Sequence, residues 1–143
     1  MVIRFLIPKD NVEDEDEYEE CAATLVKSGV AEIACIPFYV YDVALADFVS
    51  YDEHGQFVEV IIPSGRVAFR LLRDDLPDLD WRNILDHLQL LGALWEAQSD
   101  IMVAIDCATV LVADEVSEYL VELEQKGIAK FETVTTGYRI NPK

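Results

Sequence analysis

Short apolar segments separated by polar turns make up the first half of the chain. The apolar segments are residues 3–7, 21–26, 30–38, 43–52 and 56–63, and glycine-containing turns lie at 27–29, 53–55 and 64–66. Short apolar runs bounded by turn residues are typical of β-strands. The pattern therefore predicts a small antiparallel β-unit that includes a hairpin around Gly29. A helix through Tyr18, Ala22 and Leu25 also fits the spacing, but the hairpin is preferred.

Two segments in the second half have helical periodicity. The first is predicted to begin at a cap formed by Asp80 and to end near Gly92. The second is predicted to begin at a cap formed by Asp114 and to end at Gly127. Apolar side chains recur on one face of each helix, Trp81, Ile84, Leu85, Leu88 and Leu91 in the first and Val116, Tyr119, Leu120 and Leu123 in the second.

Strand-like runs flank these helices at residues 67–72, 94–99, 101–106 and 130–138. The resulting order, βαββαβ, is that of the ferredoxin-like split βαβ arrangement. We therefore expect an α+β protein in two parts. A small antiparallel β-unit, residues 1–66, is expected to pack on a C-terminal ferredoxin-like half, residues 67–143.

The net charge of the chain limits the kinds of molecule that it can bind. The chain has 28 acidic against 11 basic residues, a net charge of −17, while 52% of its residues are hydrophobic. The apolar content predicts a folded protein rather than a disordered one. The charge opposes binding to nucleic acids and to anionic membranes, and it favours a basic protein partner. A surface that is acidic only for solubility is the alternative.

Two clusters of carboxylates are the candidate partner-binding residues. They are Glu13, Asp14, Glu15, Asp16 and Glu17, and Asp74, Asp75, Asp78 and Asp80. The first cluster belongs to a run of eight acids in residues 10–20, which we interpret as a solvated loop because like charges repel. The second precedes the first helix, where the helix dipole favours negative charge. Helix capping explains only one or two of the four aspartates in the second cluster. A partner-binding surface is therefore considered for both clusters.

The expected location is cytoplasmic. The first residues lack the long apolar core and the cleavage site of a signal peptide. No apolar run approaches the roughly 20 residues that span a bilayer. Cys21, Cys35 and Cys107 are odd in number and widely spaced among apolar neighbours, which favours three reduced, buried thiols over a disulfide framework.

Sequence motifs for catalysis are missing. Ser64 lacks the first glycine and the following helix of a nucleophile elbow, and the sequence has no metal-binding spacing or glycine-rich phosphate loop. Neither His54 nor His87 lies in a motif, so a histidine-dependent enzyme is only a third hypothesis. We predict no enzymatic activity, no metal and no cofactor. The aromatics Phe38, Tyr39 and Tyr41 are interpreted as core and rim packing rather than a ligand platform.

The run "IPFYVYDVALADFV" at residues 36–49 and the strands and turn after it resemble the bacterial family of domain of unknown function 4265, over residues 18–138. Members typically show I-P-F-F-A-Y-G-V-S-L-G-D-V-V, then an acidic turn, a strand and an R-S-G-H turn. Matching residues are Ile36, Pro37, Phe38, Tyr39, Tyr41, Val43, Leu45, Asp47 and Val49. The chain departs from the pattern with Ala46 for the glycine before Asp47 and with Arg66 for the histidine.

The resemblance implies that Asp47 holds backbone amides at a turn rather than moving protons. In size and bacterial distribution the family is similar to small proteins that neutralise toxins exchanged between competing bacteria. By this analogy, the leading hypothesis is a non-enzymatic immunity protein that occludes the active site of a cognate, basic toxin domain. The alternative hypothesis is a small-molecule-binding or regulatory domain.

Overall fold

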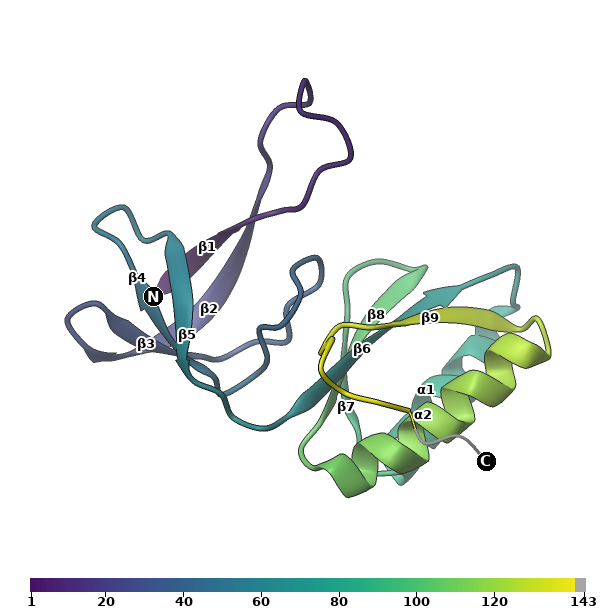
Figure 1. Cartoon of the computed structure of the whole chain (residues 1–143). Helices are drawn as coiled ribbons and strands as arrows, with labels where there is room; N and C mark the ends of the chain where they lie inside the picture. The colour runs from purple at the N-terminus through teal and green to yellow at the C-terminus, as the bar shows by residue number, and fades with distance from the viewer. Residues whose placement is uncertain (141–143) are drawn as a thin grey trace. The chain divides into compact units, whose positions relative to one another are not determined.

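The computed structural model describes residues 1–140 of the 143-residue chain. Its contacts divide into two compact units, Met1–Ser64 and Gly65–Lys143, which we call unit 1 and unit 2. Unit 1 contains a five-stranded sheet, and unit 2 contains a four-stranded sheet with two helices (Figure 1). The paired strands of both sheets run antiparallel, which confirms the α+β class in its broad form.

Unit 1 is an antiparallel sheet in the order β1-β2-β3-β4-β5. The strands are β1 (Val2–Leu6), β2 (Tyr18–Lys27), β3 (Val30–Ile33), β4 (Phe48–Tyr51) and β5 (Phe57–Ile62). The predicted hairpin is confirmed, since β2 pairs with β3 and Gly29 has a φ of 81°. An isolated parallel bridge joins Arg4 of β1 to Gln56, the residue just before β5, so the two edges of the sheet approach each other at this point.

Alternating side chains of β1 to β4 fill the unit 1 core, together with Val40 and Val43. These two valines come from the connection between β3 and β4, residues 34–47, which we call the signature loop because it holds most of the run that resembles the family. The strand predicted from residue 43 is therefore wrong in its first part, because β4 begins only at Phe48.

Unit 2 has the strand order β7-β8-β6-β9. Its elements are β6 (Val67–Arg73), α1 (Asp78–Leu90), β7 (Leu94–Ala97), β8 (Met102–Cys107), α2 (Val110–Gln125) and β9 (Ala129–Thr133). Alternate residues of β6 and β8, such as Phe69 and Ile105, form one core with the buried faces of both helices. The predicted order of strands and helices is observed.

Both predicted helix caps are wrong. The α1 helix begins at Asp78 after Pro77 and has no side-chain cap, so Asp80 lies inside the first turn, where the helix dipole still favours its charge. The α2 helix begins at Val110, and Thr109 caps it by accepting a hydrogen bond from the Val112 amide at 3.2 Å. No helix within residues 1–140 is long and apolar enough to cross a membrane.

Candidate functional site

The first acidic cluster lies in the connection between β1 and β2, and we call residues 13–17 the acidic loop. All five of its residues are exposed. Lys9 crosses the base of the loop, with its Nζ 2.7 Å from Asp16 Oδ1 and 3.1 Å from the Asp14 carbonyl oxygen. Asn11 Oδ1 accepts from the Glu13 amide at 3.1 Å. Among residues 1–140, the other four carboxylates of the loop have no cationic partner, so their charges face solvent.

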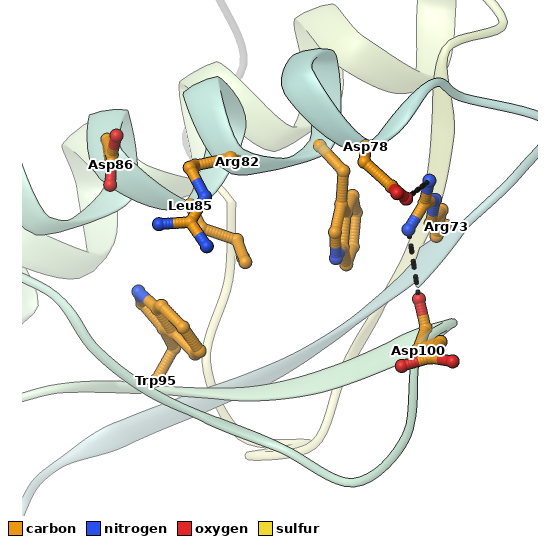
Figure 2. A pocket seen from close by; sticks show the side chains of 8 residues that line it. Arg73, Asp78, Arg82, Leu85, Asp86, Trp95 and Asp100 are labelled. Atoms are coloured by element: carbon orange, nitrogen blue, oxygen red, sulfur yellow. Dashed lines mark hydrogen bonds and ion pairs between the residues drawn. The ribbon is translucent and has the colours of Figure 1, made fainter.

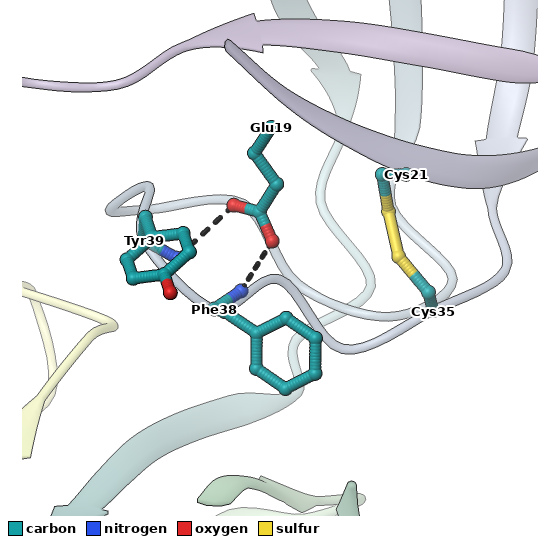
Figure 3. The surroundings of a disulfide bond; sticks show 5 residues. All are labelled: Glu19, Cys21, Cys35, Phe38 and Tyr39. Atoms are coloured by element: carbon teal, nitrogen blue, oxygen red, sulfur yellow. Dashed lines mark hydrogen bonds between the residues drawn. A yellow bond between two sulfur atoms is a disulfide. The ribbon is translucent and has the colours of Figure 1, made fainter. Parts of the chain in front are cut away.

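The solvated-loop interpretation fails at the end of the acidic run, because β2 already begins at Tyr18 and Glu19 is buried. The Glu19 carboxylate accepts hydrogen bonds from two amides of the signature loop, Phe38 N at 2.6 Å and Tyr39 N at 3.0 Å (Figure 3). The rings of Phe38 and Tyr39 are half-buried. Glu19 is therefore a structural residue that fixes the aromatic part of the loop.

A disulfide joins Cys21 to Cys35 beside this contact, with Cα atoms 6.1 Å apart (Figure 3). The expectation of three reduced thiols is therefore wrong for this pair and correct for Cys107, which is free and buried. The register of the β2–β3 hairpin explains the disulfide. Ala23 pairs with Ile33, and the same antiparallel register two residues further along brings Cys21 and Cys35 together.

Asp47 closes the other end of the signature loop. Its Oδ2 accepts from the Ala44 amide at 2.9 Å and its Oδ1 from the Ser64 amide at 2.7 Å. The side chain is buried, so these contacts satisfy donors that water does not reach. The prediction that Asp47 holds backbone amides is confirmed.

The second acidic cluster occupies the turn between β6 and α1 and the first turn of α1, in unit 2. Its four residues are exposed. Asp78 Oδ1 lies 2.6 Å from a guanidinium nitrogen of Arg73. In the described part of the chain, Asp74, Asp75 and Asp80 form no ion pair. The two predicted clusters therefore belong to different units and are treated as separate surfaces.

The residues considered for catalysis are dispersed. His54 is exposed in the turn before β5 and lies 3.4 Å from Glu53. His87 is exposed on α1 in the other unit, with its ring 4.3 Å from that of Tyr119. Burial raises the pKa of the Cys107 thiol to about 12, so this cysteine is uncharged at neutral pH and is a poor nucleophile.

A buried ion pair lies next to Cys107. Arg66 Nε donates to both carboxylate oxygens of Asp106, at 3.0 and 2.9 Å, and a second guanidinium nitrogen donates to one of them. The hydrogen bond with Asp106 raises the pKa of Arg66. The Asp106 side chain is fully buried, so this pairing keeps its charge compensated.

A pocket of about 360 Å³ lies between α1 and β7 in unit 2, and we call it the α1–β7 pocket (Figure 2). Its lining residues are Arg73, Asp78, Trp81, Arg82, Leu85, Asp86, Trp95 and Asp100. The volume is in the range of small-molecule sites. The sequence did not indicate the pocket, because Trp81 fits the apolar face of the first helix and Trp95 fits a short strand. Only the packing of α1 against β7 brings the two indoles to one cavity.

Comparison with known proteins identifies the family. The family model described as Domain of unknown function (DUF4265) matches residues 19–131. The chain belongs to this family. No curated protein matches the sequence. The structure is similar to one entitled "Novel crystal structure of a hypothetical protein from Neisseria gonorrhoeae", with a TM-score of 0.76 and 16% identity, over 97% of this chain and 98% of that one. At this identity the similarity shows the fold alone.

The departures of this DUF4265 chain from the expected run have visible backbone consequences. Asp42 and Ala46 stand at the two glycine positions of the run, and their φ angles are 60° and 67°. These are left-handed conformations that glycine adopts without steric cost. Arg66, at the position of the expected histidine, forms the ion pair with Asp106. Backbone geometry thus explains the two glycine positions of the signature loop.

Proposed function

We propose that this DUF4265 protein is a non-enzymatic immunity protein, which binds a cognate bacterial toxin domain and occludes its active site. The observation that supports the proposal best is the acidic loop. Four of its five exposed carboxylates lack a cationic partner within residues 1–140, in a chain with a net charge of −17. Charges that a protein does not compensate internally are available to a partner.

Complementary charge explains how such a complex would form. A toxin domain that acts on nucleotides or nucleic acids carries a basic active site, because it must bind phosphates. The acidic loop would steer that surface toward unit 1 and raise the rate of association. Two apolar side chains beside the loop, Val12 with 90% exposure and Tyr18 with 36%, offer anchors that become desolvated in the complex.

Binding to the product of the adjacent gene tests the proposal. The test variant carries Glu13→Gln, Asp14→Asn, Glu15→Gln and Glu17→Gln. The control variant neutralises four exposed carboxylates that form no ion pair in the described structure, Glu20→Gln, Glu59→Gln, Glu96→Gln and Glu115→Gln. Both variants change the net charge equally, so any difference between them reports the position of the charges.

We expect the acidic-loop variant to associate about tenfold more slowly than the control, with a weaker dependence on salt. Equal losses in both variants would show that only net charge matters. The proposal fails if the purified protein forms no stable complex with any neighbouring gene product. The second proposed surface, Asp74, Asp75, Asp78 and Asp80, belongs to unit 2 and needs a separate variant. Asp74→Asn, Asp75→Asn and Asp80→Asn neutralise the three members that do not pair with Arg73.

The α1–β7 pocket favours a second candidate function, a small-molecule-binding or regulatory domain. A ligand that binds only the folded protein raises its melting temperature. Screening of metabolites by thermal shift therefore tests this function. A matched screen of an Arg82→Gln variant would show whether a positive result depends on the pocket.

We further infer that unit 2 is ferredoxin-like. The observations that support this inference are the element order β6-α1-β7-β8-α2-β9 and the sheet order β7-β8-β6-β9, in which the first and third strands of the unit are central. An experimental structure tests it. Pairing of β9 with any strand other than β6 would contradict it.

We propose a cytoplasmic location, which fits protection of a cell from an incoming toxin. The Cys21–Cys35 disulfide favours the opposite conclusion, because disulfides are rare in reducing compartments. Alkylation of free thiols at the moment of cell lysis, followed by mass spectrometry, distinguishes a cytoplasmic location from an oxidising compartment. Alkylated Cys21 and Cys35 would support the cytoplasmic location, and an intact disulfide would count against it.

A further inference from the structure

The α1–β7 pocket contains two hydrogen-bond donors that the described chain does not use. Trp95 Nε1 is buried and has no acceptor among residues 1–140. A buried donor without a partner costs about 1–3 kcal/mol, so native structures contain few of them. Arg82 is exposed and forms no ion pair in the described part of the chain. Figure 2 shows Arg82 and Leu85 of α1 and Trp95 of β7 pointing toward the same space.

The other arginine of the pocket is already occupied. Arg73 donates to the Leu76 carbonyl oxygen, to Asp78 Oδ1 at 2.6 Å and to the Asp100 carbonyl oxygen at 3.4 Å. Its guanidinium also lies 5.8 Å from the centre of the Trp81 ring. The positive charge of Arg73 is therefore compensated within the protein. Arg82 is the cation of the pocket that remains available to a ligand.

We propose that the α1–β7 pocket binds a planar aromatic carboxylate. Its ring would stack on the indole walls and contact Leu85, and its carboxylate would accept from Trp95 Nε1–H and from the Arg82 guanidinium. A pocket of about 360 Å³ accommodates a molecule of one or two fused rings. The net negative charge of the chain opposes any anion, but salt screens exposed charges beyond about 8 Å at physiological ionic strength.

Asp86 is the residue that competes with such a ligand. It lies one helical turn after Arg82 on α1 and also lines the pocket. Residues four apart on a helix are neighbours, so the Asp86 carboxylate and a bound carboxylate would both attract the same guanidinium. Removal of the Asp86 charge should therefore strengthen ligand binding, whereas removal of the Arg82 charge should weaken it.

This inference deepens the second candidate function and is independent of toxin binding. It assigns a ligand class to the pocket in unit 2, whereas the acidic loop belongs to unit 1. Failure of the pocket to bind a ligand would say nothing against the toxin complex. Absence of a toxin complex would likewise say nothing against the pocket. The two proposals therefore fail separately.

The two indole N–H groups provide the readout, because Trp81 and Trp95 are the only tryptophans in the chain. Each gives its own cross-peak in a proton–nitrogen correlation spectrum of the full-length protein, and a Trp81→Phe variant assigns them. The probes are 2-naphthoate, the neutral 2-naphthamide and the cationic 2-naphthylmethylammonium. We expect 2-naphthoate to shift the Trp95 cross-peak saturably and downfield, with at least about fivefold tighter binding than either analogue.

Charge variants complete the test. Arg82→Gln should weaken 2-naphthoate binding about tenfold, and Asp86→Asn should tighten it about threefold. Lys130→Gln removes the same charge from β9, at the opposite edge of the sheet from β7, and should leave the affinity unchanged. Tighter binding of the cationic probe would overturn the ligand class while keeping a ligand pocket. Unchanged indole cross-peaks with all three probes would overturn the proposal and count against the second candidate function.

Discussion

Ala46 holds a backbone conformation that favours glycine. Its φ of 67° brings the methyl group close to the backbone, which costs about 1 kcal/mol relative to glycine. Glycine also gives the unfolded chain more freedom, which offsets part of this relief, so we predict that Ala46→Gly raises the free energy of unfolding by only about 0.5 kcal/mol. Urea denaturation followed by circular dichroism measures the change.

Ala44 provides the control in the same loop. It is buried and has no positive φ, so Ala44→Gly increases backbone freedom in the unfolded chain without relieving strain. That variant should lose about 1 kcal/mol. If both variants change the free energy of unfolding in the same direction, the positive φ of Ala46 does not determine the effect of Ala46→Gly.

Asp47 permits a graded test, because its two carboxylate oxygens accept from two different amides. Asp47→Ala removes the carboxylate that accepts from the Ala44 and Ser64 amides and should cost about 3 kcal/mol of stability. Asp47→Asn keeps one carbonyl oxygen and should cost about half as much. Asp10→Ala, at an exposed position, should change stability by less than about 0.5 kcal/mol. A catalytic role would instead predict near-normal stability for all three variants.

Thiol reactivity should follow burial and disulfide pairing. The raised pKa of Cys107, about 12, keeps its thiol protonated at neutral and weakly alkaline pH, and burial blocks reagents. We predict no rapidly reacting thiol in the native protein, one after denaturation without reductant, and three after denaturation and reduction. Titration with a chromogenic disulfide reagent counts them. Any rapid reaction of the native protein would contradict the assignment.

At the scale of elements, the start of α2 depends on Thr109. Its hydroxyl oxygen accepts from the Val112 amide, one of the first amides of the helix, which have no partner within the helix. Thr109→Ala should lower the free energy of unfolding by about 1 kcal/mol and increase hydrogen exchange in the first turn of α2. Thr109→Ser retains the cap and should have a smaller effect. Equal effects of both variants would show that the methyl group, rather than the hydroxyl, contributes the stability.

The sequence predicted the succession of elements well, because apolar periodicity reports which face of an element is buried. It misplaced the start of α2 because Val110, Leu111 and Val112 are apolar and extend the pattern of the preceding strand. Intrinsic helix propensity is too weak to mark the first turn of α2 against this apolar pattern. The helical periodicity is therefore clear only after that turn.

The disulfide and the pocket required information that local patterns do not contain. A bulge between Leu25 and Lys27 shifts the β2–β3 register, and this shift determines that Cys21 meets Cys35. Trp81 and Trp95 line one cavity because α1 packs against β7, although each residue fits an ordinary core pattern in its own element. The exposure of the two acidic clusters, in contrast, could be predicted from the sequence, because charged side chains are rarely buried without a partner.

At the scale of the whole molecule, the chemical features divide between the units. The disulfide and the acidic loop belong to unit 1, while both tryptophans, the free cysteine and the α1–β7 pocket belong to unit 2. The two hydrophobic cores are likewise separate sets of residues. Each unit therefore carries its own probe of unfolding, the disulfide in unit 1 and the two tryptophans in unit 2.

This division predicts that reduction of the disulfide destabilises unit 1 selectively. Cys21 and Cys35 are 14 residues apart, and a cross-link that closes a loop of this length contributes about 3 kcal/mol. Reduction should increase hydrogen exchange in peptides from β2 to β4, while the urea midpoint seen by tryptophan fluorescence, which reports on unit 2, stays constant. The Cys21→Ser, Cys35→Ser double variant should behave like the reduced protein and should not respond to reductant. A parallel shift of the fluorescence midpoint would show that the two units unfold as one cooperative block.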